Sequence, residues 1–225
     1  MHSQMFTSVA PHFQQGVFPK LDLPAILAEK NLVSCSIEGV ELYGGPLARD
    51  ALAQIQEKYS HPIGSAMSQG LSPIIDVRIQ RLMPGMYPSI PGWHCDAVPR
   101  SNYTGQPDFS MIVREAFHVA LLLSNEPKGV SNTEYVKTNI SPKIWDKEHV
   151  YQDLHRQVER MGPDTVFAKD GQFAWFTPKT IHRAKPCERR GVRMFMRFSM
   201  YHKPPVQNAV VNAQQVYILS EENGW

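Results

Sequence analysis

Prolines and glycines are spread along the whole chain, and they limit what it can fold into. Eighteen prolines and fourteen glycines interrupt the 225 residues, so few stretches are long enough for an extended helix. Such frequent turn-forming residues favour a class rich in short strands. Because 42% of the residues are hydrophobic, the chain can also bury a sizeable core. We therefore predict one compact, mainly β domain with a few flanking helices.

Apolar residues that alternate with polar ones predict the strands. Ile75, Val77 and Ile79 alternate in this way, as expected for a strand with one buried face. Asp170-Gly171 is a turn signal that predicts a tight hairpin between the two strands flanking it. Further strands are predicted at 117–123, 165–168, 173–176, 192–201 and 216–219.

Apolar residues that recur every three or four positions predict two longer helices. One covers 46–59 and places Ala48, Leu52 and Ile55 on one face. The other lies between Pro142 and Gly162, and its apolar face consists of Val150, Leu154, Val158 and Met161. We expect both helices to pack on a sheet. A short helix, a loop rich in glycine and serine, and a flexible lid are predicted at 25–30, 64–72 and 100–114.

Charge and cysteine content restrict the function classes. The net charge of +2 is too small to indicate a polyanionic partner. We interpret the basic residues within 183–203 as a solvated hairpin, and nucleic-acid binding is not predicted. Three cysteines without a CxxC pair indicate neither a disulfide framework nor a zinc knuckle, and they fit a reducing compartment. No stretch is typical of a signal peptide or a membrane span, so we expect a cytoplasmic protein.

His94 and Asp96 are separated by one residue in a stretch predicted to be extended. In a strand, residues i and i+2 point the same way, so these two side chains would face one side and Cys95 the other. If His182 comes from a neighbouring strand, the three supply two imidazoles and one carboxylate, a set typical of non-haem Fe(II) oxygenases. We therefore predict that His94, Asp96 and His182 are metal ligands at a catalytic centre.

The order of motifs around this set resembles that of the Fe(II)/2-oxoglutarate-dependent dioxygenases. The resemblance covers about 74–204 of the chain and implies a double-stranded β-helix, a jelly roll of two sheets with the metal at its mouth. The expected division is an N-terminal arm and helical buttress at 1–72, an oxygenase core at 73–205 and a C-terminal extension at 206–225, with residues 1–20 forming the arm or an edge strand. The matching residues are His94-Cys95-Asp96, the run from Gly171 to Phe176, His182-Arg183, and Arg193 or Arg197 with Ser199.

The resemblance also implies cofactors and a reaction. Two imidazoles and one carboxylate would bind Fe(II) and leave positions for 2-oxoglutarate and O2. Family members oxidise a substrate while 2-oxoglutarate becomes succinate and CO2. The family's halogenases lack the carboxylate, so Asp96 favours hydroxylation or a related oxidation. We expect a small metabolite or amino-acid-like substrate. The alternatives are a non-catalytic cupin-like protein that binds a metal or ligand, and an oxygenase that modifies a peptide or nucleobase.

An arginine of the last strand is expected to bind the distal carboxylate of 2-oxoglutarate, because a guanidinium offers two parallel donors. Arg193, Arg197 and Ser199 share one strand face by the period of two. Arg197 with Ser199 matches the Arg-x-Ser pattern of part of the family and would lie opposite His182 in the predicted hairpin, so it is the preferred assignment. Arg193 matches members whose arginine lies closer to the histidine, including the phytanoyl-CoA hydroxylase type, and it is the alternative.

Overall fold

The computed structural model describes residues 3–19, 22–126, 129–130, 133–202, 204–213 and 215–218. The protein is mainly β, as predicted, and its strands form antiparallel sheets. The strands are β1 Gln4–Met5, β2 His12–Gln15, β3 Asn31–Cys35, β4 Leu71–Leu82, β5 Phe117–Ser124, β6 Thr133–Val136, β7 Lys143–Ile144, β8 Thr165–Phe167, β9 Gln172–Phe176, β10 His182–Ala184, β11 Gly191–His202 and β12 Ala209–Val211. The helices are α1 Leu23–Leu27, α2 Ile37–Tyr43, α3 Pro46–Lys58, α4 Ser60–Ser68 and α5 Val150–Met161, with a 3-10 turn at Phe109–Met111.

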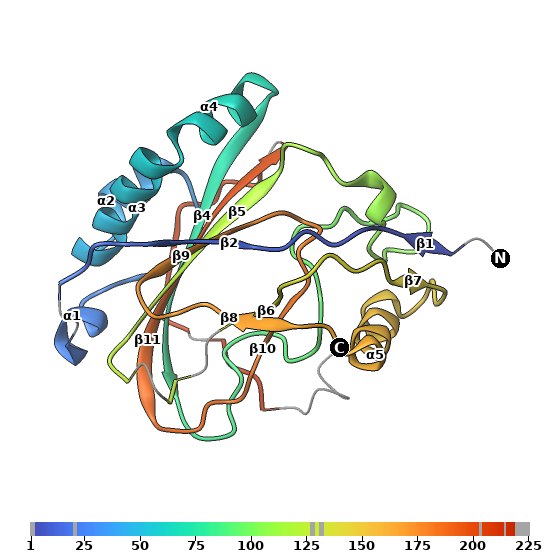
Figure 1. Cartoon of the computed structure of the whole chain (residues 1–225). Coiled ribbons are helices and arrows are strands. Elements are labelled where there is room, and N and C mark those ends of the chain that lie inside the picture. Colours follow the sequence, from blue (N-terminus) through green and yellow to red (C-terminus); the bar gives the residue numbers. More distant parts are fainter. Residues whose placement is uncertain are drawn as a thin grey trace.

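A large sheet and a small sheet form the body of the molecule. The large one has seven strands in the order β12-β3-β4-β11-β5-β9-β2, and the small one has three in the order β10-β6-β8. Figure 1 shows α2, α3 and α4 along one side of the large sheet, with the small sheet on the other side. A separate pair, β1 with β7, lies beside α5.

The two faces of the large sheet differ in chemistry, and β11 shows why. Met194, Met196 and Phe198 are fully buried in the core that includes α3, as the alternation in the sequence predicts. Arg193 and Arg197 alternate with these residues along β11, and they line a pocket on the other face. Because β11 pairs along its whole length with β4, the polar residues of both strands are brought onto this second face.

A buried carboxylate caps the N-terminus of α3. Gly45 occupies the N-cap position and has no side chain to accept a hydrogen bond, but Glu29 reaches in from the end of α1. Its two oxygens accept hydrogen bonds from Leu47 N at 2.6 Å and from Ala48 N at 3.4 Å. Glu29 therefore satisfies amide groups that otherwise lack a partner at a helix start.

Replacing Glu29 with alanine is expected to lower the free energy of unfolding by about 1–2 kcal/mol, the usual effect of losing a helix cap. Urea denaturation followed by circular dichroism measures the change. Glu41→Ala is the matched control, because Glu41 is exposed on α2. Equal stabilities for the two variants would contradict the capping role.

The loop predicted at 64–72 and the hairpin predicted at Gly171 are both wrong. Residues 64–72 are not a loop, because α4 extends to Ser68 and β4 begins at Leu71. Ile63 and Ala66 are buried against the core, and this packing stabilises a helix that glycine and serine disfavour. Gly171 does make a turn with a left-handed φ of 74°, but β8 pairs with β6 whereas β9 pairs with β5 and β2.

The predicted hairpin from His182 to the last strand is also wrong. β10 pairs with β6 in the small sheet, and β11 pairs with β4 and β5 in the large one. The connection bonds to other segments, since Cys187 N donates to Met86 O and Glu188 N donates to Gly129 O. The basic residues around this connection are therefore only partly solvated: Arg189 and Arg190 are exposed as predicted, whereas Arg183 and Arg193 are buried.

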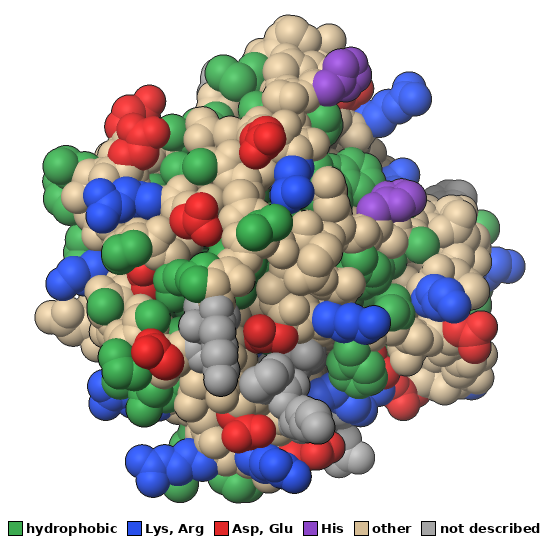
Figure 2. Space-filling model, turned by 60° about the vertical axis from the view of Figure 1, so that its left-hand side comes forward, with side chains coloured by type: hydrophobic (Ala, Val, Ile, Leu, Met, Phe, Trp, Pro, Cys, Tyr) green, Lys and Arg blue, Asp and Glu red, His purple; other side chains and the backbone are tan. Residues whose placement is uncertain are grey.

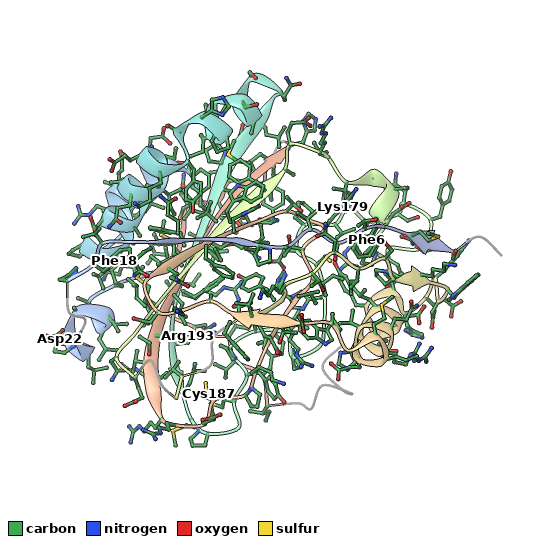
Figure 3. All side chains as sticks on the ribbon, viewed as in Figure 1. Phe6, Phe18, Asp22, Lys179, Cys187 and Arg193 are labelled. Atoms are coloured by element: carbon green, nitrogen blue, oxygen red, sulfur yellow. The ribbon has the colours of Figure 1, made fainter. Side chains whose placement is uncertain are left out.

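Segments outside the predicted core contribute strands to the same large sheet. β2 and β3 precede residue 72, and β12 follows residue 205. The N-terminal arm also docks on the body through Phe6, which is labelled in Figure 3. Its ring stacks on that of Phe109 with centroids 3.9 Å apart. In the tail, Tyr217 forms an isolated bridge with Tyr87 instead of the predicted strand, and Leu219 lies outside the described residues. None of the described helices has the length and apolar composition needed to cross a bilayer.

Candidate metal centre

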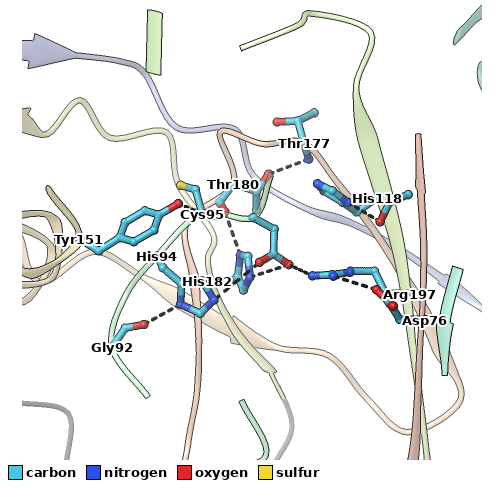
Figure 4. Close-up of polar contacts among 12 residues, drawn as sticks. Asp76, Gly92, His94, Cys95, His118, Tyr151, Thr177, Thr180, His182 and Arg197 are labelled. Carbon is cyan, nitrogen blue, oxygen red and sulfur yellow. Dashed lines mark hydrogen bonds and ion pairs between the residues drawn. The ribbon is translucent and has the colours of Figure 1, made fainter. Parts of the chain in front are cut away.

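Two backbone segments bring His94 and His182 side by side. His94 N donates to His182 O and His182 N donates to His94 O, both at 2.9 Å, so the residues form an isolated antiparallel bridge. Directly paired residues project their side chains from the same face. The two imidazole centroids are accordingly 4.5 Å apart (Figure 4). The sequence predicted a strand at His94, but this single bridge is all the pairing that the segment makes in the described structure.

Each imidazole is oriented by a backbone carbonyl. His94 Nδ1 lies 2.8 Å from Gly92 O, and His182 Nδ1 lies 3.0 Å from Thr180 O. A carbonyl only accepts, so each Nδ1 carries the hydrogen in these contacts. In the neutral tautomer the lone pair then lies on Nε2, which is the form that binds a metal.

Asp96 completes the set from a turn after His94. Its Oδ1 lies 3.9 Å from His94 Nε2, and its Oδ2 lies 3.5 Å from His182 Nε2. Residue Ala97 has a left-handed φ of 57°, which turns the chain away directly after the carboxylate. One donor atom from each of the three residues falls within 4.8 Å of the others. The structure therefore brings together all three predicted ligands.

The electrostatics of this cluster suit a cation. Burial opposes ionisation of Asp96, but Arg197 and His182 outweigh it and hold the pKa of the carboxyl well below its usual range. Burial, and then the neighbouring His182, lower the pKa of His94 to about 4. At neutral pH Asp96 is thus a carboxylate and His94 a neutral imidazole. Lone pairs that face one another in this way repel unless a proton or a cation lies between them.

The donor set fits a divalent transition metal. Imidazole nitrogen and carboxylate oxygen together suit Fe(II) and related ions, and three protein ligands on one side leave coordination positions for small molecules. Cys95, the residue between two of the candidate ligands, is buried in an apolar cluster, as its position on the opposite strand face predicts.

Arg197 is held between two carboxylates. Its Nη1 donates to Asp96 Oδ2 at 2.7 Å and its Nη2 donates to Asp76 Oδ2 at 3.1 Å (Figure 4). Asp76 lies directly opposite Arg197 in the β4–β11 register, and its other oxygen accepts a hydrogen bond from Ser34 N. Burial lowers the pKa of Arg197, but Asp96 outweighs this effect and raises it. Arg197 therefore orients the candidate ligand Asp96.

Ser199, predicted to act with Arg197, is directed elsewhere. Its side chain is 1% exposed, and its Oγ lies 2.8 Å from His118 Nδ1. His118 is fully buried, packs on Phe176, and has its pKa lowered to about 3 mainly by burial. No local pattern in the sequence indicates this pairing, because it depends on the β5–β11 register, which places His118 directly opposite Ser199.

Arg193 has a different environment from Arg197. It is 2% exposed, its Nε donates to Gln80 Oε1 at 2.8 Å, and its guanidinium lies 5.6 Å from the centre of the Phe195 ring. Burial is the main cause that lowers its pKa to about 9. Figure 3 places its side chain toward the same end of the molecule as Cys187. The sequence did not identify Gln80 as its partner, because that contact depends on the β4–β11 register.

A pocket of about 150 Å³ joins these groups. The three candidate ligands share its wall with both arginines and with apolar residues from the small sheet. A wider cleft of about 520 Å³ shares Ile90 and Tyr217 with the pocket. Pocket residues that the sequence did not indicate as functional include Asp76, Ser89, Tyr135 and Gln215.

Comparison with known proteins gives distant likenesses only. No family model matches the sequence, and no curated protein matches it. Among solved structures, an N-substituted L-amino acid dioxygenase from Burkholderia ambifaria is similar over 85% of this chain and 86% of that one, with 14% identity and a TM-score of 0.41. A nickel complex of the non-haem monooxygenase ThoJ covers 79% and 76%, with 14% identity and a TM-score of 0.35. EctD from S. alaskensis covers 84% of each chain, with 9% identity and a TM-score of 0.32. Because these TM-scores are low, the site is interpreted from its own residues.

Proposed function

We propose that this protein is an Fe(II)- and 2-oxoglutarate-dependent oxygenase that hydroxylates a small metabolite or amino-acid-like substrate. The observation that carries the proposal is the convergence of His94 Nε2, His182 Nε2 and the Asp96 carboxylate on one wall of a pocket that also contains buried arginines. The opposed large and small sheets would then be the two halves of a double-stranded β-helix, with 73–205 as the oxygenase core.

The three ligands would hold the metal by the atoms that the local structure leaves available. His94 and His182 would bind through Nε2, because their Nδ1 atoms are engaged with backbone carbonyls. Asp96 would bind as a carboxylate held in place by Arg197. With Fe(II) bound there, 2-oxoglutarate and O2 would provide oxidation of a substrate C–H bond, with release of succinate and CO2.

We assign the distal carboxylate of 2-oxoglutarate to Arg193 and not to Arg197. Arg197 already meets two carboxylates, so a third would have to compete with Asp96 and Asp76 for the same guanidinium. Arg193 lies on the same strand face and on the same pocket wall. Gln80 fixes its Nε, which orients the guanidinium within the pocket.

The substrate would occupy the wider cleft and reach the metal past Ile90 and Tyr217, the residues common to both cavities. Arg100 and Glu148 line this cleft and could recognise groups of opposite charge on an amino-acid-like molecule. We also propose a cytoplasmic location, because Cys35, Cys95 and Cys187 form no disulfide.

Anaerobic addition of Fe(II) and 2-oxoglutarate tests the proposal. The complex is expected to develop a weak visible charge-transfer band, and exposure to O2 is expected to release succinate. The apo protein with 2-oxoglutarate alone is the control. Absence of both signals would rule out the proposed function. A band without succinate, across a panel of small amino-acid-like substrates, would instead support the non-catalytic cupin-like alternative.

A further inference from the structure

One face of α5 contacts both segments that carry the candidate histidine ligands. Tyr151, His155 and Glu159 recur every four residues and therefore lie on the same side of the helix. The pattern of apolar residues predicted only that α5 covers a sheet. The contacts of these three side chains point to a second role.

The first contacts involve the residues on either side of His94. Tyr151 Oη donates to Cys95 O at 2.5 Å, and Trp93 N donates to His155 Nδ1 at 3.2 Å. The Tyr151 ring also meets the His94 ring edge-on, with centroids 6.2 Å apart (Figure 4). Residue 94 makes only an isolated bridge, so regular sheet pairing does not fix the neighbouring backbone. Helix α5 provides this fixation.

Glu159 extends the contacts to His182. Its Oε1 accepts from Trp93 Nε1 at 2.5 Å and from Arg183 Nη1 at 2.7 Å. Trp93 precedes His94 in the chain, and Arg183 follows His182. The Arg183 guanidinium also lies 4.1 Å from the centre of the Trp93 ring, an arrangement that adds a cation–π attraction. A single carboxylate of α5 thus ties together the neighbours of both imidazoles.

We infer that the Tyr151–His155–Glu159 face of α5 is a positioning element that sets the metal affinity of the site. It acts through the backbone of 93–95 and through Arg183, and it fixes the separation of the two imidazoles before a metal binds. Preorganised ligands bind more tightly, because less conformational freedom is lost on binding. The inference rests on the proposed function only in requiring that His94, Asp96 and His182 bind a metal.

Binding of Mn²⁺ and Co²⁺ to the full chain tests the inference without substrate or turnover. Tyr151→Phe removes one oxygen and keeps the ring, and Glu159→Gln removes the charge and keeps an acceptor. Each variant is expected to bind Mn²⁺ about 10-fold more weakly or worse, the lower end of the range for residues that orient metal ligands. The visible spectrum of the Co²⁺-saturated variants is expected to shift, because the ligand geometry changes. A purely structural role would leave that spectrum unchanged.

Arg156→Ala is the matched control. Arg156 lies on the same helix, but its side chain is 56% exposed and approaches Asp146 and Asp153 instead. The control is expected to keep the wild-type affinity and spectrum. Wild-type Kd values and spectra in both test variants, even with a lower Tm, would overturn the inference and leave the proposed function standing. Failure of the wild-type protein to bind either ion would overturn the proposed function itself.

Discussion

Asp96→Ala is expected to lower the affinity for Fe(II) or Mn²⁺ by more than about 100-fold, beyond the range seen when a residue that only orients a ligand is lost. The variant removes the one anionic donor of the set and leaves two neutral imidazoles. It also removes one of the two carboxylates that pair with the Arg197 guanidinium, whose positive charge near the metal is then balanced by Asp76 alone. Isothermal titration with Mn²⁺ measures the affinity, and the visible band with Fe(II) and 2-oxoglutarate is expected to disappear.

Two further variants separate this loss from a loss of stability. Cys95→Ala changes the adjacent buried residue and is expected to keep both the metal and the visible band, since Cys95 packs in an apolar cluster. Asp96→Asn keeps an oxygen that can accept from Arg197, so its unfolding midpoint should stay closer to that of the wild type than the midpoint of Asp96→Ala. Wild-type metal affinity in Asp96→Ala would refute Asp96 as a ligand.

Arg193→Lys is expected to weaken 2-oxoglutarate binding by about 10- to 100-fold, the effect of losing one charged hydrogen bond of about 1.5–3 kcal/mol. Lysine keeps the charge but lacks the planar pair of donors and the Nε that Gln80 fixes. Metal affinity should be unchanged, because the Arg193 contacts described here do not include the three candidate ligands. Titrating 2-oxoglutarate into the anaerobic Fe(II) protein measures the loss.

The same substitution at Arg197 gives the opposing test. Arg197→Lys is expected to reduce metal affinity and stability more than 2-oxoglutarate affinity, because Arg197 contacts Asp96 and Asp76. A larger loss of 2-oxoglutarate binding in Arg197→Lys than in Arg193→Lys would contradict the assignment to Arg193. It would show that Arg197, which forms the Arg-x-Ser motif with Ser199, binds the co-substrate.

Much of the secondary structure could be predicted because it follows from local periodicity. The alternation at Ile75, Val77 and Ile79 lies within β4, and the four-residue recurrence from Ala48 lies within α3. Both patterns reflect which side of one element is buried, and the chain itself carries that information. Strand β12 was missed because it is short and half-exposed at a sheet edge.

Strand partners could not be predicted from local signals. The turn at Gly171 reverses the chain, but β8 and β9 pair in different sheets. A turn specifies a change of direction within a few residues, whereas the partner of a strand depends on which distant segment can cover its apolar side. The predicted hairpin from His182 to β11 was wrong for the same reason.

The sequence by itself determined which side chains are candidates for binding a metal and a carboxylate. The tertiary structure decided which of these side chains contact one another. The His-x-Asp spacing and the order of motifs were enough to predict His94, Asp96 and His182 as a ligand set. The period of two placed Arg193 and Arg197 on one face of β11 but could not distinguish them. That distinction comes from the β4 register, which sets Asp76 opposite Arg197 and Gln80 opposite Arg193. An ion pair depends on which residue lies across the sheet, and only the folded chain brings residues 76 and 197 together.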